Sequence, residues 1–419
     1  MKNDKSSEET IFTACATDEE MRNTAAIESF QVKGNDIEDK SGSMKLLGPS
    51  ELRSPAGTSC VDFEFAEPLK KGESANLITL MVTTNMMKPL PARKKQLEAQ
   101  LVVSTLTQHL VSPYTIQSEN SSVMLPSSNV KSHDAPAPTK QEDTSLKLGP
   151  YHKLKPFSSD VFSVHVENEN PLVHATRATR EIDVSHWGTI RVRESYDIHN
   201  FGAEIEGEWS RLDMMLKEKS AKSGAALNFR GRIPRSSYDL TFRDDIGNIS
   251  TSISSLTKDS RMVLLEPRYP IFGGWSTKFK FEYTLPLSSS VFKDSERHYV
   301  LQVLSLPTLI DVTYDQLEMR ILLPEGAKLV NESGIKAQYQ KTVSKEFTYF
   351  DFLGRPVISL SMKNMIPEAA EYLKVEYTYS SMLRYQKHVV VGIALLIIAV
   401  SVQLASQIDL GNGAKKKAA

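Results

Sequence analysis

The sequence predicts a mainly β protein, with two tandem antiparallel β-sandwich-like domains followed by one C-terminal transmembrane α-helix. Three observations predict this class. Apolar and polar residues alternate over many short segments, as they do in half-buried strands. Gly, Pro and Asn turn residues separate these segments. One long apolar segment without charge, Val389–Ala405, lies near the C-terminus.

Composition narrows the functional classes. The chain has 419 residues, enough for two or three domains that each bury a core. It carries 50 basic and 51 acidic side chains, and this balance argues against a nucleic-acid-binding protein. The two cysteines, Cys15 and Cys60, lie far from any metal-type spacing. Their positions leave one disulfide and two unpaired thiols equally open.

The N-terminal part of the chain has the weaker pattern. Residues 1–45 are polar, weakly patterned and without the apolar core of a signal peptide. Residues 46–159 contain strand-like runs, such as Val61, Phe63 and Phe65 alternating with acidic residues, and are predicted to form the first β-domain. Within it, residues 118–159 are rich in Ser, Pro, Asn and Lys and are predicted to be a loop or interdomain linker.

Residues 160–384 have the more regular pattern and are predicted to form the second β-domain. The runs that alternate with polar residues include Phe162, Val164 and Val166; Phe279, Phe281, Tyr283 and Leu285; Leu317, Met319 and Ile321; and Leu373, Val375, Tyr377 and Tyr379. In a strand this period places one face in a core and the other in water. Residues 214–222 form the best short helical stretch.

The segment Val389–Ala405 is predicted to be a transmembrane helix. Its length corresponds to roughly 25 Å of helix, close to the thickness of a thin bilayer. A buried core helix is the alternative. Small and polar residues along it are predicted to pack against partner helices. These residues are Gly392, Ala394, Ala399, Ser401 and Gln403.

The last segment, residues 406–419, is predicted to be a short cytosolic tail. Lys416 and Lys417 stand at the third and fourth positions from the C-terminus, as in the dilysine retrieval signal of endoplasmic-reticulum membrane proteins. A basic flank that follows any membrane segment is the alternative.

No catalytic, cofactor-binding or metal-binding residues are predicted. The nine histidines form no HExxH motif, and the sequence has no GxSxG, Walker A or GxGxxG motif. His165 and His174 are a weak metal candidate. Asp244 and Asp245 are adjacent, so on a strand they would point to opposite faces and make a poor acid–base pair.

Three N-x-S/T sequons make glycosylation of the chain itself feasible in a lumenal setting. Their asparagines are Asn120, Asn248 and Asn331.

Residues 149–384 strongly resemble the ribophorin I family. The matching stretches occur in family order: LGPYHKLKPFSSDVFSVHVEN, REIDVSHWGTIRVRESYDI, EGEWSRLD, FRDDIGNISTS, LEPRYPIFGGWSTKFKFEYTLP, ILLPEGAK and YFDFLGRPVISLSMKN. Residues 30–148 resemble the family's first domain more loosely, through QVKG at residues 31–34 and through Pro113 and Tyr114.

The resemblance implies a non-catalytic accessory or scaffold subunit of the oligosaccharyltransferase. That complex transfers a preassembled glycan from dolichyl diphosphate to Asn in N-x-S/T of nascent proteins, and a separate multi-span subunit performs the chemistry. The implied partners are this catalytic subunit, other subunits, nascent polypeptides and the translocon, with no nucleic acid and no cofactor. The implied location is the endoplasmic-reticulum membrane, with lumenal β-domains and a cytosolic C-terminus.

The resemblance also implies that the first domain is truncated, because the family's signal peptide and opening strands have no counterpart after Met1. A tail-anchored adaptor with cytosolic β-domains is therefore the alternative function. An independent enzyme is a third hypothesis, and the missing motifs disfavour it.

Aromatic and basic residues in turns are the candidate contacts for partners or acceptor chains. For the two tryptophans among them, packing within a turn or core is the favoured alternative. The candidates are His186, Trp187, Arg268, Tyr269, Phe272, Trp275 and Arg355.

Overall fold

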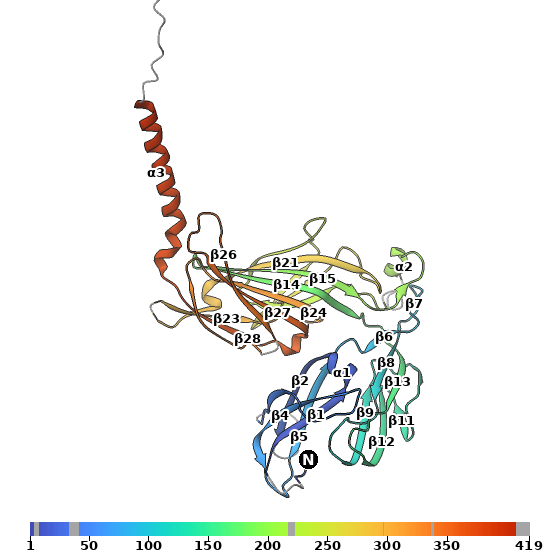
Figure 1. The fold of residues 1–419 in the computed structure, drawn as a ribbon. Coiled ribbons are helices and arrows are strands. Elements are labelled where there is room, and N and C mark those ends of the chain that lie inside the picture. The colour runs from blue at the N-terminus through green and yellow to red at the C-terminus, as the bar shows by residue number, and fades with distance from the viewer. Residues whose placement is uncertain (4–7, 33–41, 217–222, 296, 337–338, 408–419) are drawn as a thin grey trace, which may run out of the picture.

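The computed structural model describes residues 1–3, 8–32, 42–216, 223–295, 297–336 and 339–407. It is mainly β, with antiparallel sheets and one apolar C-terminal helix, so the predicted fold class is confirmed. Two small lobes lie beside a larger β-rich lobe, and the long helix leaves the larger lobe at one end (Figure 1).

The N-terminal lobe contains two small sheets, β1-β4-β3 and β2-β5. Phe63, Phe65 and Met44 lie in its core. The described part of residues 1–45 contains two long strands and a short helix, which the weak pattern of this segment does not predict. The elements are β1 (Glu9–Thr17), α1 (Asp18–Arg22), β2 (Thr24–Val32), β3 (Lys45–Pro49), β4 (Thr58–Leu69) and β5 (Asn76–Thr83).

Cys15 and Cys60 form a disulfide within this lobe. They stand directly opposite each other in the antiparallel pairing of β1 with β4. Of the two readings that the sequence leaves open, the structure has the disulfide.

The middle lobe packs two further sheets, β10-β13-β8-β6 and β11-β12-β9, around a core that includes Val102, Leu146 and Phe162. The prediction of a loop or linker over residues 118–159 is wrong. Strands of the middle lobe fill this segment, and they look polar in sequence because one face of each strand meets solvent. The elements are β6 (Met87–Pro89), β7 (Arg93–Lys94), β8 (Leu101–Thr107), β9 (Ile116–Met124), β10 (Val130–His133), β11 (Thr139–Glu142), β12 (Ser145–Leu154) and β13 (Val161–Glu167).

The strand β13 also corrects a boundary. The predicted start of the second domain at residue 160 would place β13 there, but β13 pairs with β8 and β10 of the middle lobe. The sheets of the large lobe begin with β14 (Val173–Ser185).

The large lobe is a sandwich. One layer is a seven-stranded sheet in the order β18-β21-β15-β14-β24-β27-β26. The sheets β22-β23-β28-β25 and β17-β20-β19 share its hydrophobic core. Neighbours pair antiparallel in the large sheet except β14 and β24, which are parallel. The apolar members of β21 and β28 are buried, as the alternation predicts.

The remaining strands and helices complete this lobe. They are β15 (Thr189–Asn200), β16 (Glu204–Ile205), α2 (Arg211–Leu216), β17 (Phe229–Pro234), β18 (Tyr238–Asp244), β19 (Ile253–Leu256), β20 (Ser260–Leu265), β21 (Ser276–Pro286), η2 (Leu287–Ser289), β22 (Val291–Lys293), β23 (His298–Leu304), β24 (Thr313–Leu322), β25 (Lys328–Ser333), β26 (Gln340–Glu346), β27 (Arg355–Met365), η3 (Pro367–Ala369), β28 (Tyr372–Thr378) and η4 (Ser381–Tyr385). The helix predicted over 214–222 corresponds to α2, and its residues 217–222 lie outside the described ones.

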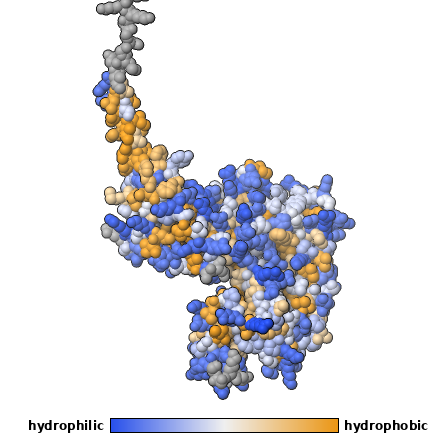
Figure 2. Space-filling model, in the orientation of Figure 1, coloured by the Kyte–Doolittle hydropathy of each residue, from blue (hydrophilic) through white to orange (hydrophobic). Residues whose placement is uncertain are grey.

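The helix α3 (Gln386–Gln407) contains the predicted membrane segment. Its 22 residues correspond to about 33 Å of helix, enough to cross a hydrocarbon core of about 30 Å. None of its residues is buried against the body, so the buried-core alternative is excluded. Figure 2 shows the helix as an apolar column that stands clear of the lobes. Lys416 and Lys417 lie outside the described residues.

A buried polar junction joins the middle lobe to the large lobe. The Gln100 side chain donates hydrogen bonds of 3.0 Å to the carbonyls of Asn168 and Asn170, and its Oε1 accepts one of 3.0 Å from the Ala203 amide. Asn200 donates to the Gly224 carbonyl at 2.7 Å within the same junction. A smaller contact joins the N-terminal lobe to β27, through the Asn364 amide and the Asn23 carbonyl at 2.9 Å.

Candidate partner-binding surfaces

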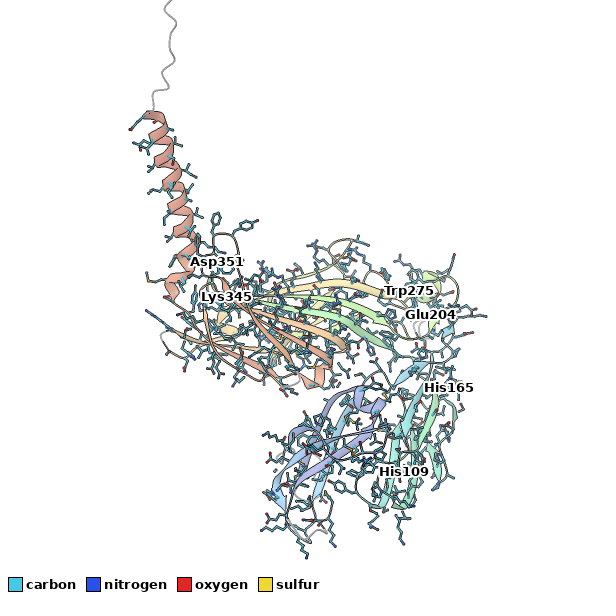
Figure 3. All side chains as sticks on the ribbon, viewed as in Figure 1. His109, His165, Glu204, Trp275, Lys345 and Asp351 are labelled. Atoms are coloured by element: carbon cyan, nitrogen blue, oxygen red, sulfur yellow. A yellow bond between two sulfur atoms is a disulfide. The ribbon has the colours of Figure 1, made fainter. Side chains whose placement is uncertain are left out.

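The predicted contact residues lie at two ends of the large lobe. One end, called membrane-proximal here, is the end from which α3 leaves. The other, called distal, lies beside α2 (Figure 1). Figure 3 places Trp275 and Glu204 at the distal end, and Lys345 and Asp351 near the base of α3.

His186 and Trp187 occupy the turn between β14 and β15 at the membrane-proximal end. Gly188 completes this turn with a φ of 107°, a left-handed conformation that glycine adopts without strain. Trp187 is 58% exposed. Its ring centre lies 5.8 Å from that of Tyr385 and 5.3 Å from that of His388, so the turn packs against the start of α3.

His186 faces inward from the same turn. Its ring stacks on Tyr379 at 4.2 Å, and its Nε2 shares a hydrogen bond of 3.0 Å with the Tyr377 hydroxyl. Burial, and then the positive charge of Arg384, lower the pKa of His186 to about 4. The ring is therefore neutral at neutral pH and supports the turn instead of presenting a charge.

The distal end gathers Tyr269, Phe272 and Trp209 around Trp275. The ring centre of Trp275 lies 5.4 Å from Phe272, 6.2 Å from Tyr269 and 6.4 Å from Trp209. Phe272 is only 1% exposed, so it is not available as a surface contact. Tyr269 is 41% exposed and is the member of this cluster that a partner can reach most readily.

The two candidate arginines make internal contacts. Arg268 binds the Asp244 carboxylate, with Nε to Oδ2 at 2.6 Å, and donates to the carbonyls of Gly247 and Asn248. This pairing lowers the pKa of Asp244. Arg355 binds Asp183 and donates to the Leu323 carbonyl at 3.1 Å. Both side chains fasten loops to the large sheet.

Exposed aromatic residues that the sequence reasoning did not select lie between β26 and β27. The segment 347–354, called the aromatic loop here, exposes Phe347, Tyr349, Phe350 and Phe352. A dense aromatic run that falls between two strands, instead of alternating within one, is the sequence signal that identifies it.

The two histidines considered as a metal site bind different partners. His165 Nε2 is 2.7 Å from the Leu90 carbonyl oxygen, and His174 Nδ1 is 3.0 Å from Asp315 Oδ1. Within the described part of the chain, no group of three or more His, Cys, Asp and Glu side chains could hold a metal ion. The three sequon asparagines, Asn120, Asn248 and Asn331, are all exposed.

The candidate packing residues of α3 divide between two faces. At 100° per residue, Gly392, Ala399 and Gln403 fall within about 40° of one another. Ala394 and Ser401 share the opposite face. No atom lies within 4 Å of the position that a Cβ would take at Gly392. The helix therefore presents a surface with small residues and one amide that nothing in the described chain covers.

Comparison with known proteins assigns a family. The family model described as Ribophorin I matches residues 1–406. "Dolichyl-diphosphooligosaccharide--protein glycosyltransferase subunit 1A" of Arabidopsis thaliana is 32% identical over 327 residues, which are 78% of this chain and 53% of that protein. The Caenorhabditis elegans subunit 1 is 29% identical over 82% of this chain and 58% of its own length. Subunit 1B of Arabidopsis thaliana is 28% identical over 93% of this chain and 84% of its own length.

The chain spans just over half the length of the first two relatives. Among solved structures, an M1 zinc metallopeptidase from Deinococcus radiodurans is 8% identical with a TM-score of 0.30, over 48% of this chain and 42% of that chain. That likeness is too slight to indicate a shared fold.

Proposed function

The chain belongs to the ribophorin I family, and on that premise we propose that it is a non-catalytic scaffold subunit of the oligosaccharyltransferase in the endoplasmic-reticulum membrane. Family membership over residues 1–406 is the observation that carries this proposal. The complex transfers a preassembled glycan from dolichyl diphosphate to asparagine in N-x-S/T. In this proposal the chemistry belongs to a separate multi-span subunit, and this chain stabilises that subunit and presents nascent polypeptides to it near the translocon.

The architecture supports a scaffold. The Gln100 junction and the Asn364 contact tie the three lobes together, and α3 attaches them to the membrane. Lobes that are joined to one another and attached to the membrane by one helix can hold a partner subunit and a nascent polypeptide at a fixed distance and orientation. Trp187 and Tyr269 are the exposed candidates for such contacts, at opposite ends of the large lobe.

The disulfide supports a lumenal orientation. Disulfides form and persist in the lumen of the endoplasmic reticulum and are rare in the cytosol. The Cys15–Cys60 bond lies in the N-terminal lobe, so it supports a lumenal position for that lobe and a cytosolic position for the end of α3. The same observation disfavours a tail-anchored adaptor with cytosolic β-domains.

Reporter glycosylation tests the proposed role. Depleting the chain from cells should leave sequons of a reporter unoccupied, and re-expressing the full chain should restore them. The catalytic subunit should copurify with the re-expressed chain. Normal reporter glycosylation after depletion, or glycan transfer by the purified chain alone, would contradict a non-catalytic scaffold.

Protease digestion of sealed microsomes tests the orientation separately. A lumenal body stays intact until detergent opens the vesicles, and Cys15 and Cys60 react with a thiol reagent only after reduction. Digestion of the body in sealed vesicles, together with two free thiols, is the result that the adaptor hypothesis requires.

A further inference from the structure

The aromatic loop carries an inference that goes beyond the proposed function. Phe347 is 62% exposed, Tyr349 90%, Phe350 55%, Phe352 72% and Leu353 44%. Soluble surfaces rarely gather this many large apolar side chains on one short loop, and such a patch marks an interaction site.

The loop is held beside the first turn of α3. Gln386 of the helix donates to Asp351 Oδ1 at 3.4 Å, and Lys387 donates to the Thr348 hydroxyl at 3.0 Å. Lys387 also forms an ion pair with Glu325, which accepts a hydrogen bond from Thr348 at 3.1 Å. The position of the loop relative to α3 is thus fixed by polar contacts with the first two residues of the helix.

The conformation of the loop is fixed as well. Asp351 Oδ1 accepts hydrogen bonds of 3.0 Å from the amides of Leu353 and Gly354. Gly354 has a φ of 73°, and a Cβ there would lie 3.0 Å from the Phe347 ring. Asp351 thus binds the backbone amides on the inner side of the loop, and the apolar side chains of the loop are exposed.

The level of the loop along the membrane normal follows from α3. The uncharged apolar segment begins at Val389, and the loop is bound to Gln386 and Lys387, less than one helical turn earlier. Trp187 and Tyr385 lie at the same level, where aromatic side chains of membrane proteins concentrate. Figure 1 shows the connection from β26 rising beside the lower part of α3, and Figure 3 labels Asp351 there.

We propose that the aromatic loop inserts Phe347, Tyr349 and Phe352 into the interfacial layer of the lipid bilayer as a second membrane contact beside α3. One helix alone lets the body swing about its base, whereas a helix and a neighbouring wedge define an orientation. The bilayer is the proposed occupant because the loop is fastened to the first turn of the helix that is expected to span it. This inference rests on α3 spanning a membrane and is independent of the glycan-transfer role.

Spin labels on the full chain in lipid nanodiscs test the wedge. The Cys15–Cys60 disulfide leaves an introduced thiol as the labelling site. A nitroxide at F352C should collide more often with oxygen than with the water-soluble nickel complex NiEDDA. M124C, 83% exposed on β9, and V343C, 48% exposed on β26, are the matched water-facing controls, and their nickel accessibility should be several-fold higher.

Two outcomes would overturn the wedge. One is nickel accessibility at F352C equal to that at M124C, while flotation with the nanodiscs shows that α3 is inserted. The other is a label that is water-accessible in nanodiscs and shielded from both reagents only in the assembled complex, because a partner protein then covers the loop. Failure of the reporter glycosylation test leaves this measurement unaffected.

Discussion

A buried ion pair organises the core of the large lobe. Arg180 and Glu194 stand opposite each other on β14 and β15, with Nη1 and Oε1 3.0 Å apart and side chains 8% and 0% exposed. Glu194 Oε2 also accepts hydrogen bonds from the Tyr196 hydroxyl at 2.6 Å and from the Thr308 amide at 3.2 Å. Buried charges persist only when they are paired and hydrogen-bonded in this way.

Replacing Glu194 with alanine should destabilise the fold by about 3–5 kcal/mol, because it leaves the Arg180 charge buried without its partner. Chemical unfolding followed by circular dichroism measures the loss. The double variant R180M/E194L should recover most of it. The control E181A removes a partly exposed partner of Arg193 and Arg320 and should cost about 1 kcal/mol or less. Equal losses for E194A and E181A would contradict the role of the buried pair.

The depressed pKa of His186 makes stability pH-dependent. The folded pKa of about 4 lies below the ordinary value of 6.5, so the unfolded chain takes up the proton first as the pH falls. The contribution of the neutral ring is complete above about pH 6.5 and is lost as the pH approaches 4. After allowance for partial exposure it is of the order of 1 kcal/mol.

The variant H186F keeps a ring against Tyr379 and removes the titration. Its unfolding temperature should therefore fall less than that of the wild type between pH 7 and pH 4.5. Arg384, Tyr299, Tyr377 and Tyr379 face the ring, and none of them is changed. The exposed His152 gives the control H152F, which should keep the wild-type slope. Identical slopes for all three proteins would show that His186 does not titrate in this window.

Among the secondary-structure elements, the exposed edge strand β26 and the uncovered face of α3 determine which surfaces another protein can pair with. The edge strand β26 is exposed along its whole length and carries Lys341 and Lys345. Lysines on an edge discourage pairing with another sheet. The helix α3, by contrast, offers a face with Gly392, Ala399 and Gln403, which suits close approach by a partner helix.

Leucine at Gly392 should therefore reduce copurification of the catalytic subunit several-fold, because it prevents close helix packing. The control A394L places the same side chain on the opposite face and should leave copurification near the wild-type level. Quantitative pull-down from solubilised membranes compares the two variants. A larger loss for A394L would assign the contact to the face of Ala394 and Ser401.

The middle lobe is held to the large lobe by the Gln100 junction, which is buried and hydrogen-bonded. Gln100 is 0% exposed, and its side chain binds two carbonyls of the β13–β14 connection and the amide of Ala203. Unsatisfied polar groups in such a site cost about 1–3 kcal/mol each.

The variant Q100A should loosen the middle lobe from the large lobe by about 3 kcal/mol. Hydrogen exchange of the Ala203 amide, which donates to Gln100, should accelerate by about 100-fold. The exposed Gln117 of β9 supplies the control Q117A, for which no change is expected. Unaltered exchange at Ala203 in Q100A would show that other contacts hold the lobes together.

Local patterns in the amino-acid sequence predict the β class and the membrane helix, and the matching stretches indicate the family. Period-two alternation and a long uncharged apolar run are local patterns, and each reflects burial that a strand or a helix imposes on its own residues. The inward positions of β14 and β15 even contain the signal for the core ion pair, because Arg180 and Glu194 continue the buried alternation of Ile182 and Val192.

The remaining features depend on contacts between distant segments of the chain. The strands within residues 118–159 look polar because each buries only one thin face, and the edge of the middle lobe at β13 depends on its pairing with β8. The disulfide depends on the register of β1 against β4, and the inward position of Phe272 on packing around Trp275. These features join residues far apart in the chain, and no pattern within one segment encodes which distant segment will lie beside it.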